Sequence, residues 1–144
     1  MTMTILVCTD FTSAAAAGER EAAHRFPGAR LIVFHAVDTA LISRIVDLTG
    51  LDEVDLKQQM THYADMRLNE IIGRLVSQGK RALADLVAGD PVDAALASAA
   101  RHRAEMAILG VPAVTADEPG SKPTGRFRTG LARRAPFPIL IIPG

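Results

Sequence analysis

Short runs of apolar residues alternate along the chain with longer amphipathic stretches. Five of these runs read as strands, at residues 4–7, 31–34, 83–87, 106–109 and 139–142. The first two are continuously apolar, which is typical of central strands covered on both faces. The last run is flanked by Pro138 and Pro143, which cannot donate ladder hydrogen bonds. This alternation predicts a parallel sheet with helices packed against it.

The stretches between these strands have the apolar periodicity of helices. Apolar residues recur at steps of three and four from about Asp52 to Gln78, which predicts a long amphipathic helix. A cap at Thr12 or Ser13 predicts a helix that ends at Phe26, and Asp90 followed by Pro91 predicts one that ends at Arg103. A shorter helix is expected over residues 125–134. If residues 41–46 are helical, they have one apolar face. This face would pack on the protein's own core, cover the mouth of a binding site or contact a partner. The expected fold is therefore α/β, a doubly wound five-stranded parallel sheet of the Rossmann-like kind with helices on both faces.

Length and composition limit the functions that this fold can carry. A chain of 144 residues fits one domain, residues 1–144, and its 16 basic and 16 acidic residues give no net charge for nucleic-acid binding. Cys8 is the lone cysteine, so no intrachain disulfide forms, and a cytoplasmic location is expected. No apolar run approaches the roughly 20 residues that span a bilayer, so no membrane is expected among its partners.

The carboxyl ends of the first and fourth strands are the expected ligand site, because the winding direction of the sheet reverses there. Cys8, Thr9 and Asp10 follow the first strand, and Gly110 ends the fourth. Asp10 suits a ligand hydroxyl or amino group, or stabilises a helix N-terminus. Cys8 is read as a buried thiol, with a redox role as the alternative.

Catalytic and metal-binding patterns are not found in the sequence. The four histidines lie in separate elements without metal-ligand spacing, so we expect them to be structural or solvent-facing. No serine lies in a nucleophile elbow, and no carboxylate and histidine converge by sequence on the expected site. The sequence therefore predicts neither catalytic residues nor a metal site, and no self-sufficient enzyme.

The stretches that flank this site resemble those of a known family. The resemblance is carried by residues 5–12, 33–37, 89–91, 104–110 and 133–142, and is most specific at Ala135-Pro136-Phe137-Pro138 before the last strand. Over nearly its whole length the chain is similar to the universal stress proteins. That resemblance implies strand order 3-2-1-4-5, a homodimer, and membership of either the ATP-binding or the non-binding branch.

The glycine loop of the binding branch is altered in this chain. Gly110 matches the first glycine, but Ala113 stands at the second position and Gly125-Arg126 replaces a final glycine and hydroxyl residue, after a segment two residues longer. Arg126 removes a hydroxyl but adds a guanidinium, itself a strong phosphate ligand. If ATP or AMP binds and Arg126 replaces the usual hydroxyl contact, we expect weak binding through the phosphates. The implied nucleotide site comprises Cys8, Thr9, Asp10, Val37, Leu109, Gly110, Ala113, Gly125, Arg126 and Phe127.

The resemblance implies a stress-response or regulatory module that binds an adenine nucleotide between the first and fourth strands. A nucleotide-free interaction protein and a nucleotide hydrolase remain as alternatives, and they are separated by the presence of bound nucleotide and by turnover. The apolar strand at residues 139–142 needs a cover or a pairing partner at its free edge, which predicts a homodimer through that edge or the helix faces beside it.

Overall fold

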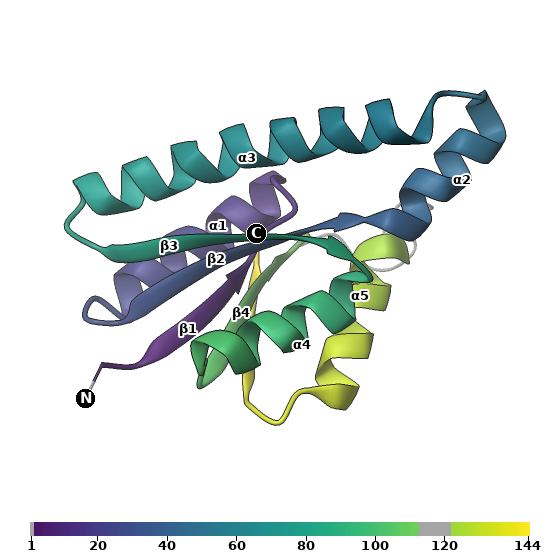
Figure 1. Ribbon diagram of the computed structural model, residues 1–144. Coiled ribbons are helices and arrows are strands. Elements are labelled where there is room, and N and C mark those ends of the chain that lie inside the picture. The colour runs from purple at the N-terminus through teal and green to yellow at the C-terminus, as the bar shows by residue number, and fades with distance from the viewer. Residues whose placement is uncertain (1, 113–121) are drawn as a thin grey trace.

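The computed structural model describes residues 2–112 and 122–144. Five parallel strands form one sheet in the order β3-β2-β1-β4-β5, as the resemblance implied (Figure 1). The strands are β1 (Thr4–Cys8), β2 (Arg30–Asp38), β3 (Arg81–Gly89), β4 (Met106–Val111) and β5 (Ile139–Pro143). All five strands expected from the apolar runs are confirmed, and each extends beyond its run, because backbone pairing continues where the apolar run has ended.

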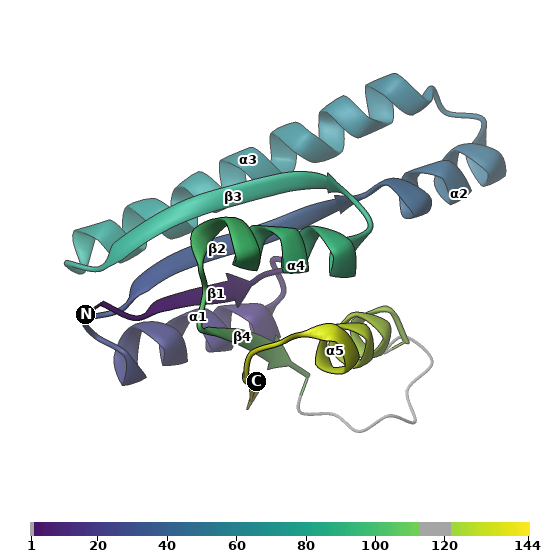
Figure 2. The ribbon, with the colours of Figure 1, turned by 60° about the horizontal axis from the view of Figure 1, so that its bottom comes forward.

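The helices cover both faces of this sheet, as expected for a doubly wound fold. In Figure 2, α4 and α5 lie in front of the sheet, and α1 and α3 lie behind it. Figure 1 shows α2 and the first half of α3 projecting beyond the carboxyl end of β2. The helices are α1 (Ser13–Arg25), α2 (Thr39–Thr49), α3 (Glu53–Ser77), α4 (Pro91–His102) and α5 (Lys122–Arg134).

Side-chain caps fix where these helices begin. Thr12 accepts a hydrogen bond from the amide of Ala15 at 3.2 Å, and Asp90 accepts one from Asp93 at 2.9 Å. Asp90 is the expected cap of its helix and Thr12 is one of the two expected candidates, and each satisfies a backbone donor that the helix leaves without a partner. The last helix begins three residues before the expected Gly125, while residues 41–46 are helical within α2, where Ile42 is buried.

Each face of the sheet has its own apolar cluster. Val7, Val33 and Ile108 point toward α1 and α3, whereas Leu6, Ile32 and Leu109 point toward α4 and α5. This division follows from the two-residue repeat of side-chain direction along a strand. It explains why the central strands are apolar at every position.

Among the residues that the structure describes, no helix is long and apolar enough to span a membrane.

Candidate functional site

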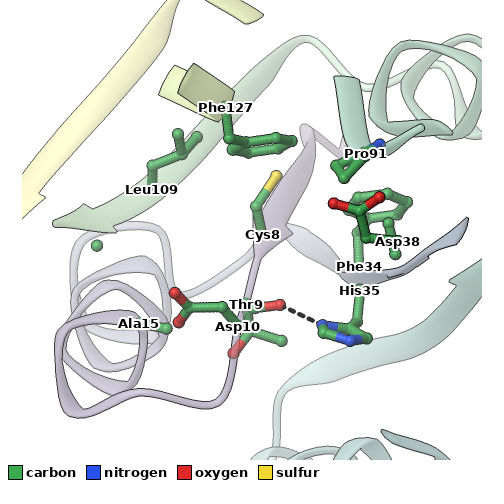
Figure 3. Close-up of a pocket in the computed structure, with 12 residues that line it drawn as sticks. Cys8, Thr9, Asp10, Ala15, Phe34, His35, Asp38, Pro91, Leu109 and Phe127 are labelled. Atoms are coloured by element: carbon green, nitrogen blue, oxygen red, sulfur yellow. Dashed lines mark hydrogen bonds between the residues drawn. The ribbon is translucent and has the colours of Figure 1, made fainter. Parts of the chain in front are cut away.

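A cavity of about 200 Å³ opens at the carboxyl ends of the central strands (Figure 3). Its position follows from strand register, because Cys8 at the end of β1 pairs with Phe34 on β2 and with Leu109 on β4. Parallel pairing thus brings three segments that are distant in sequence to one edge of the sheet. The lining residues are Cys8, Thr9, Asp10, Ala15, Phe34, His35, Ala36, Asp38, Pro91, Leu109, Gly110 and Phe127.

The structure brings together six of the ten residues in the predicted nucleotide site. These six line the cavity and are Cys8, Thr9, Asp10, Leu109, Gly110 and Phe127. Gly125 and Arg126 lie instead along a separate groove on α5, with Thr129, Gly130 and Arg133. Ala113 lies outside the described residues.

Val37, another residue of the predicted site, is buried and does not line the cavity. It is only 2% exposed. Its neighbours Ala36 and Asp38 do line it. Successive side chains in a strand point to opposite sides, so the continuation of β2 to Asp38 turns Val37 away.

His35, expected from the sequence to be structural or solvent-facing, lines the cavity. Its Nδ1 lies 2.8 Å from the backbone oxygen of Thr9, the interaction drawn in Figure 3. A carbonyl oxygen can only accept, so Nδ1 carries the proton and Nε2 of the neutral ring is an acceptor. Burial lowers the pKa of His35, more than its bond to Thr9 and the charge of Asp10 raise it, so the ring is neutral at pH 7.

An aromatic cluster holds the imidazole of His35 in place. The Phe11 ring stacks against it with centroids 4.4 Å apart, and Tyr63 meets Phe11 edge-on at 6.0 Å. The guanidinium of Arg67 lies over both carbon rings and donates to the Tyr63 hydroxyl at 2.8 Å. Phe11 has a φ of 66°, a conformation that is strained for an aromatic residue. These contacts fix the orientation of His35 at the edge of the cavity.

Two carboxylates lie along the mouth of the cavity. Oδ1 of Asp10 accepts from the amide and the hydroxyl of Thr12, at 3.1 and 2.5 Å. Oδ1 of Asp38 accepts from the first amides of α2, those of Ala40 and Leu41. In the part of the chain that the structure describes, these bonds use one oxygen of each carboxylate. The second oxygens remain as acceptors for ligand hydroxyl or amino groups.

The deeper walls of the cavity are apolar. Cys8 is 8% exposed and belongs to the cluster that includes Phe34, Leu109 and Phe127. Burial raises the pKa of the Cys8 thiol to about 12, so the thiolate needed for redox or nucleophilic chemistry does not form near neutral pH. Cys8 is therefore a wall of the cavity, in agreement with its expected role as a small apolar side chain.

Gly110 allows α1 to approach the end of β4. A Cβ at this position would lie 1.8 Å from the backbone oxygen of Ala14, and one on Gly18 would lie 2.9 Å from the amide of Gly110. No side chain can be accommodated at such distances. Gly110 is thus required by packing, in addition to any contact of its backbone with a ligand. Among the described residues, by contrast, no atom lies within 4 Å of a Cβ placed on Gly125.

Among residues 2–112 and 122–144, no group of three or more histidine, cysteine or acidic side chains is placed to hold a metal ion.

Two carboxylates at the mouth and apolar walls, at the carboxyl edge of a doubly wound sheet, would suit a small ligand with hydrogen-bond donors. A scan of protein-family models and a search of curated proteins found no match to the sequence. Solved structures, however, match the fold over almost the entire chain.

Three of these structures belong to universal stress proteins. One is a family member from Burkholderia pseudomallei, 21% identical, with a TM-score of 0.77 over 98% of this chain and 96% of that one. A second, in complex with cAMP, is 20% identical, with a TM-score of 0.66 over 99% and 97% of the two chains. A third, from Arabidopsis thaliana with AMP bound, is 14% identical, with a TM-score of 0.61 over 98% and 90%. The chain therefore has the fold of the universal stress proteins, as its sequence resemblance indicated.

Proposed function

We propose that this chain is a regulatory module of the universal stress protein type, formed by residues 1–144 as one domain, that binds an adenine nucleotide. The observation that carries the proposal is the cavity between the ends of β1 and β4, with carboxylate acceptors at Asp10 and Asp38. Two proteins of the same fold have cAMP or AMP bound. The sequence resemblance at the ends of β1 and β4 supports the same proposal.

The chemistry of the cavity suits an adenine ring. Phe34, Leu109 and Phe127 provide apolar surface for a flat heterocycle, while acceptors at the mouth face donors on the base and ribose. Adenine carries such a donor in its exocyclic amino group, and ribose carries two in its hydroxyls. The pocket and ligand are thus complementary in both apolar surface and hydrogen bonding.

The residues of the cavity favour nucleotide binding over nucleotide hydrolysis. The buried Cys8 thiol is held protonated, and the one imidazole of the cavity has its proton committed to Thr9. Hydrolysis of a phosphoanhydride requires a positioned water and compensation of charge on the phosphates. A hydrolase remains the alternative, and repeated release of ADP or AMP from ATP with magnesium would establish it.

Mass spectrometry of small molecules released from freshly purified protein, followed by calorimetry with ATP, AMP and cAMP, tests the proposal. We expect an adenine compound to bind, and the Ala36→Leu variant, which places a larger side chain at the partly buried mouth, to weaken binding at least tenfold. The exposed substitution Asp47→Asn serves as the control. Absence of heat with every adenine compound at millimolar concentration would refute nucleotide binding and leave the interaction protein.

Assembly and location complete the proposal. The free edge of β5, with Ile139, Leu140 and Ile141 partly exposed, supports a homodimer through this edge or the helices beside it. A reducing cytoplasm suits the single buried thiol of Cys8. Light scattering that shows only monomer at micromolar concentration would refute the dimer.

A further inference from the structure

The helices α1 and α3 lie on the same face of the sheet (Figure 2), and a groove of about 420 Å³ opens between α1 and the last turns of α3. Its lining residues, all between Ala16 and Lys80, differ from those of the ligand cavity. Arg20 from α1, Arg74 from α3 and Lys80 before β3 line this α1–α3 groove. They share it with the buried carboxyl group of Glu19.

The positive charge of the α1–α3 groove exceeds its negative charge. Glu19 is the one acid among the lining residues, and its two oxygens already bond to Arg74 at 3.3 Å and to the Thr9 hydroxyl at 3.1 Å. Arg20 and Lys80 form no ion pair within the described part of the chain. The three cations therefore repel one another, and a bound anion would relieve this repulsion.

The end of α3 does not require these cations as caps. The backbone oxygens of Arg74, Leu75 and Val76 accept hydrogen bonds from the amides of residues 78–80, at 2.9 to 3.2 Å. The turn that follows the helix thus satisfies carbonyl groups that a helix end leaves without partners. The guanidinium of Arg74 and the ammonium of Lys80 are therefore not needed there and are available to a ligand in the groove.

We propose that the α1–α3 groove is a second binding site, which holds a small phosphate-bearing anion on Arg20, Arg74 and Lys80. A guanidinium group donates paired hydrogen bonds to phosphate oxygens, and an ammonium group adds a compact positive charge. A phosphate group offers three acceptor oxygens, so it suits donors that approach from different elements. The groove shares no lining residue with the cavity, so this inference does not depend on nucleotide binding.

Glu19 opposes the anion and connects the groove with the ligand cavity. A phosphate on Arg74 competes with the Glu19 carboxylate for the same guanidinium, so the charge of Glu19 lowers the affinity. The other oxygen of Glu19 bonds to the hydroxyl of Thr9, which lines the cavity. A bound anion that draws Arg74 away from Glu19 therefore changes a group in contact with the cavity wall.

Calorimetry with inorganic phosphate and pyrophosphate tests the site. We expect pyrophosphate to bind with a dissociation constant of about 1 mM or lower at about 50 mM salt, and about threefold more weakly at about 500 mM salt, because salt screens charge pairs. Arg20→Gln and Lys80→Gln should each weaken binding about fivefold. Arg44→Gln, at an exposed arginine on α2, should leave binding unchanged. Equal weakening by all three variants, or no heat with either anion at about 10 mM, overturns the inference.

The Glu19→Gln variant tests the competition for Arg74. It keeps an oxygen for the Thr9 hydroxyl and removes the competing charge, so pyrophosphate should bind about fivefold more tightly. Glu21→Gln, the same change on α1 outside the groove lining, should alter binding by less than about twofold. Equal effects of the two variants overturn the inference. Recruitment to vesicles that contain phosphatidic acid, unaffected by pyrophosphate, would assign the groove to lipid headgroups and overturn a soluble ligand.

Discussion

Two carboxylates, one on each face of the sheet, show how burial and hydrogen bonding oppose each other in setting the pKa of an acid. Glu19 on α1 is the more buried, with 5% of its side chain exposed, and its two oxygens bond separately to the Thr9 hydroxyl at 3.1 Å and to Arg74 at 3.3 Å. Asp85 on β3 is 14% exposed, and one of its oxygens accepts from Ser98, Arg101 and His102. Both acids thus have a partly exposed arginine partner, but only Asp85 has three donors.

For this reason the pKa values of the two carboxyl groups are shifted in opposite directions. Burial raises the pKa of Glu19, and the Thr9 hydroxyl and the nearby arginines oppose this without cancelling it. Burial would also raise the pKa of Asp85, but the hydrogen bonds from Ser98 and Arg101, the charge of Arg101 and the bond from His102 outweigh it and lower the pKa. Convergent donors, and not burial alone, decide whether an interior carboxylate stabilises the fold.

Removal of the Asp85 carboxylate should have the largest effect. Asp85→Ala leaves the fully buried Ser98 hydroxyl without its acceptor and removes the acceptor shared by Arg101 and His102, so we expect a loss of about 3 kcal/mol in the free energy of unfolding. Urea unfolding measures this loss. Asp93→Ala, which removes an exposed ion pair with Arg134, is the matched control and should cost about 0.5 kcal/mol. Equal losses in both would contradict the special role of the three donors.

Replacing each acid by its neutral amide should give the next largest difference in stability. Asp85→Asn replaces a charged acceptor of three hydrogen bonds, so we expect a loss of about 2 kcal/mol at pH 7. Glu19→Gln keeps an oxygen for the Thr9 hydroxyl and removes the cost of burying a charge, so its change should stay within about 1 kcal/mol. Thermal and urea unfolding of both variants provide the comparison. A larger loss in Glu19→Gln would reverse the ranking.

The pH dependence of stability should show the opposite signs directly. The lowered pKa of Asp85 gives stability that is present above its unfolded pKa of about 3.9 and is lost as pH falls through the folded value. The raised pKa of Glu19 means that the native protein holds this proton more firmly, so stability falls as pH rises from about 4.3 through the folded value. Each slope is at most about 1.4 kcal/mol per pH unit.

Unfolding free energies from pH 3 to 7 measure these slopes. Glu19→Gln should remove the decline above pH 4.3, and Asp85→Asn should flatten the acid limb, because each variant lacks the titrating group. Identical profiles for the native protein and Glu19→Gln would show that the Thr9 and arginine contacts balance its burial.

The smallest effects should come from the hydroxyl donors. Ser98→Ala leaves Asp85 with two donors and should cost about 1 kcal/mol, with the pKa of Asp85 rising toward its ordinary value. Thr9→Val has the same shape but removes one of the two bonds to Glu19, so the pKa of Glu19 should rise further. The chemical shifts of the two carboxyl groups, followed during a pH titration, measure both changes in pKa. Unaltered titration in either variant would show that its hydroxyl does not set the pKa.

Local patterns determined the architecture from the sequence alone. The apolar runs predicted all five strands, and the periodicity from Asp52 to Gln78 predicted α3. Asp90 was predicted as a cap, and the cap of α1 was narrowed to Thr12 or Ser13. These features depend on side chains within a few residues of one another, whose spacing carries the same period as the structure. The strand ends at Cys8 and Gly110 likewise identified the edge where the cavity lies, because parallel strands place their carboxyl ends together.

Contacts between distant residues were decided only by the tertiary structure. His35 joins the cavity through a bond to Thr9, Val37 turns away because β2 continues past it, and Arg126 faces another surface although Phe127 beside it lines the site. The sequence likewise places Asp85 far from its partners His102 and Ser98, yet they converge on one oxygen. Register, helix rotation and desolvation set these relations, and all three arise from packing between elements that no local period encodes.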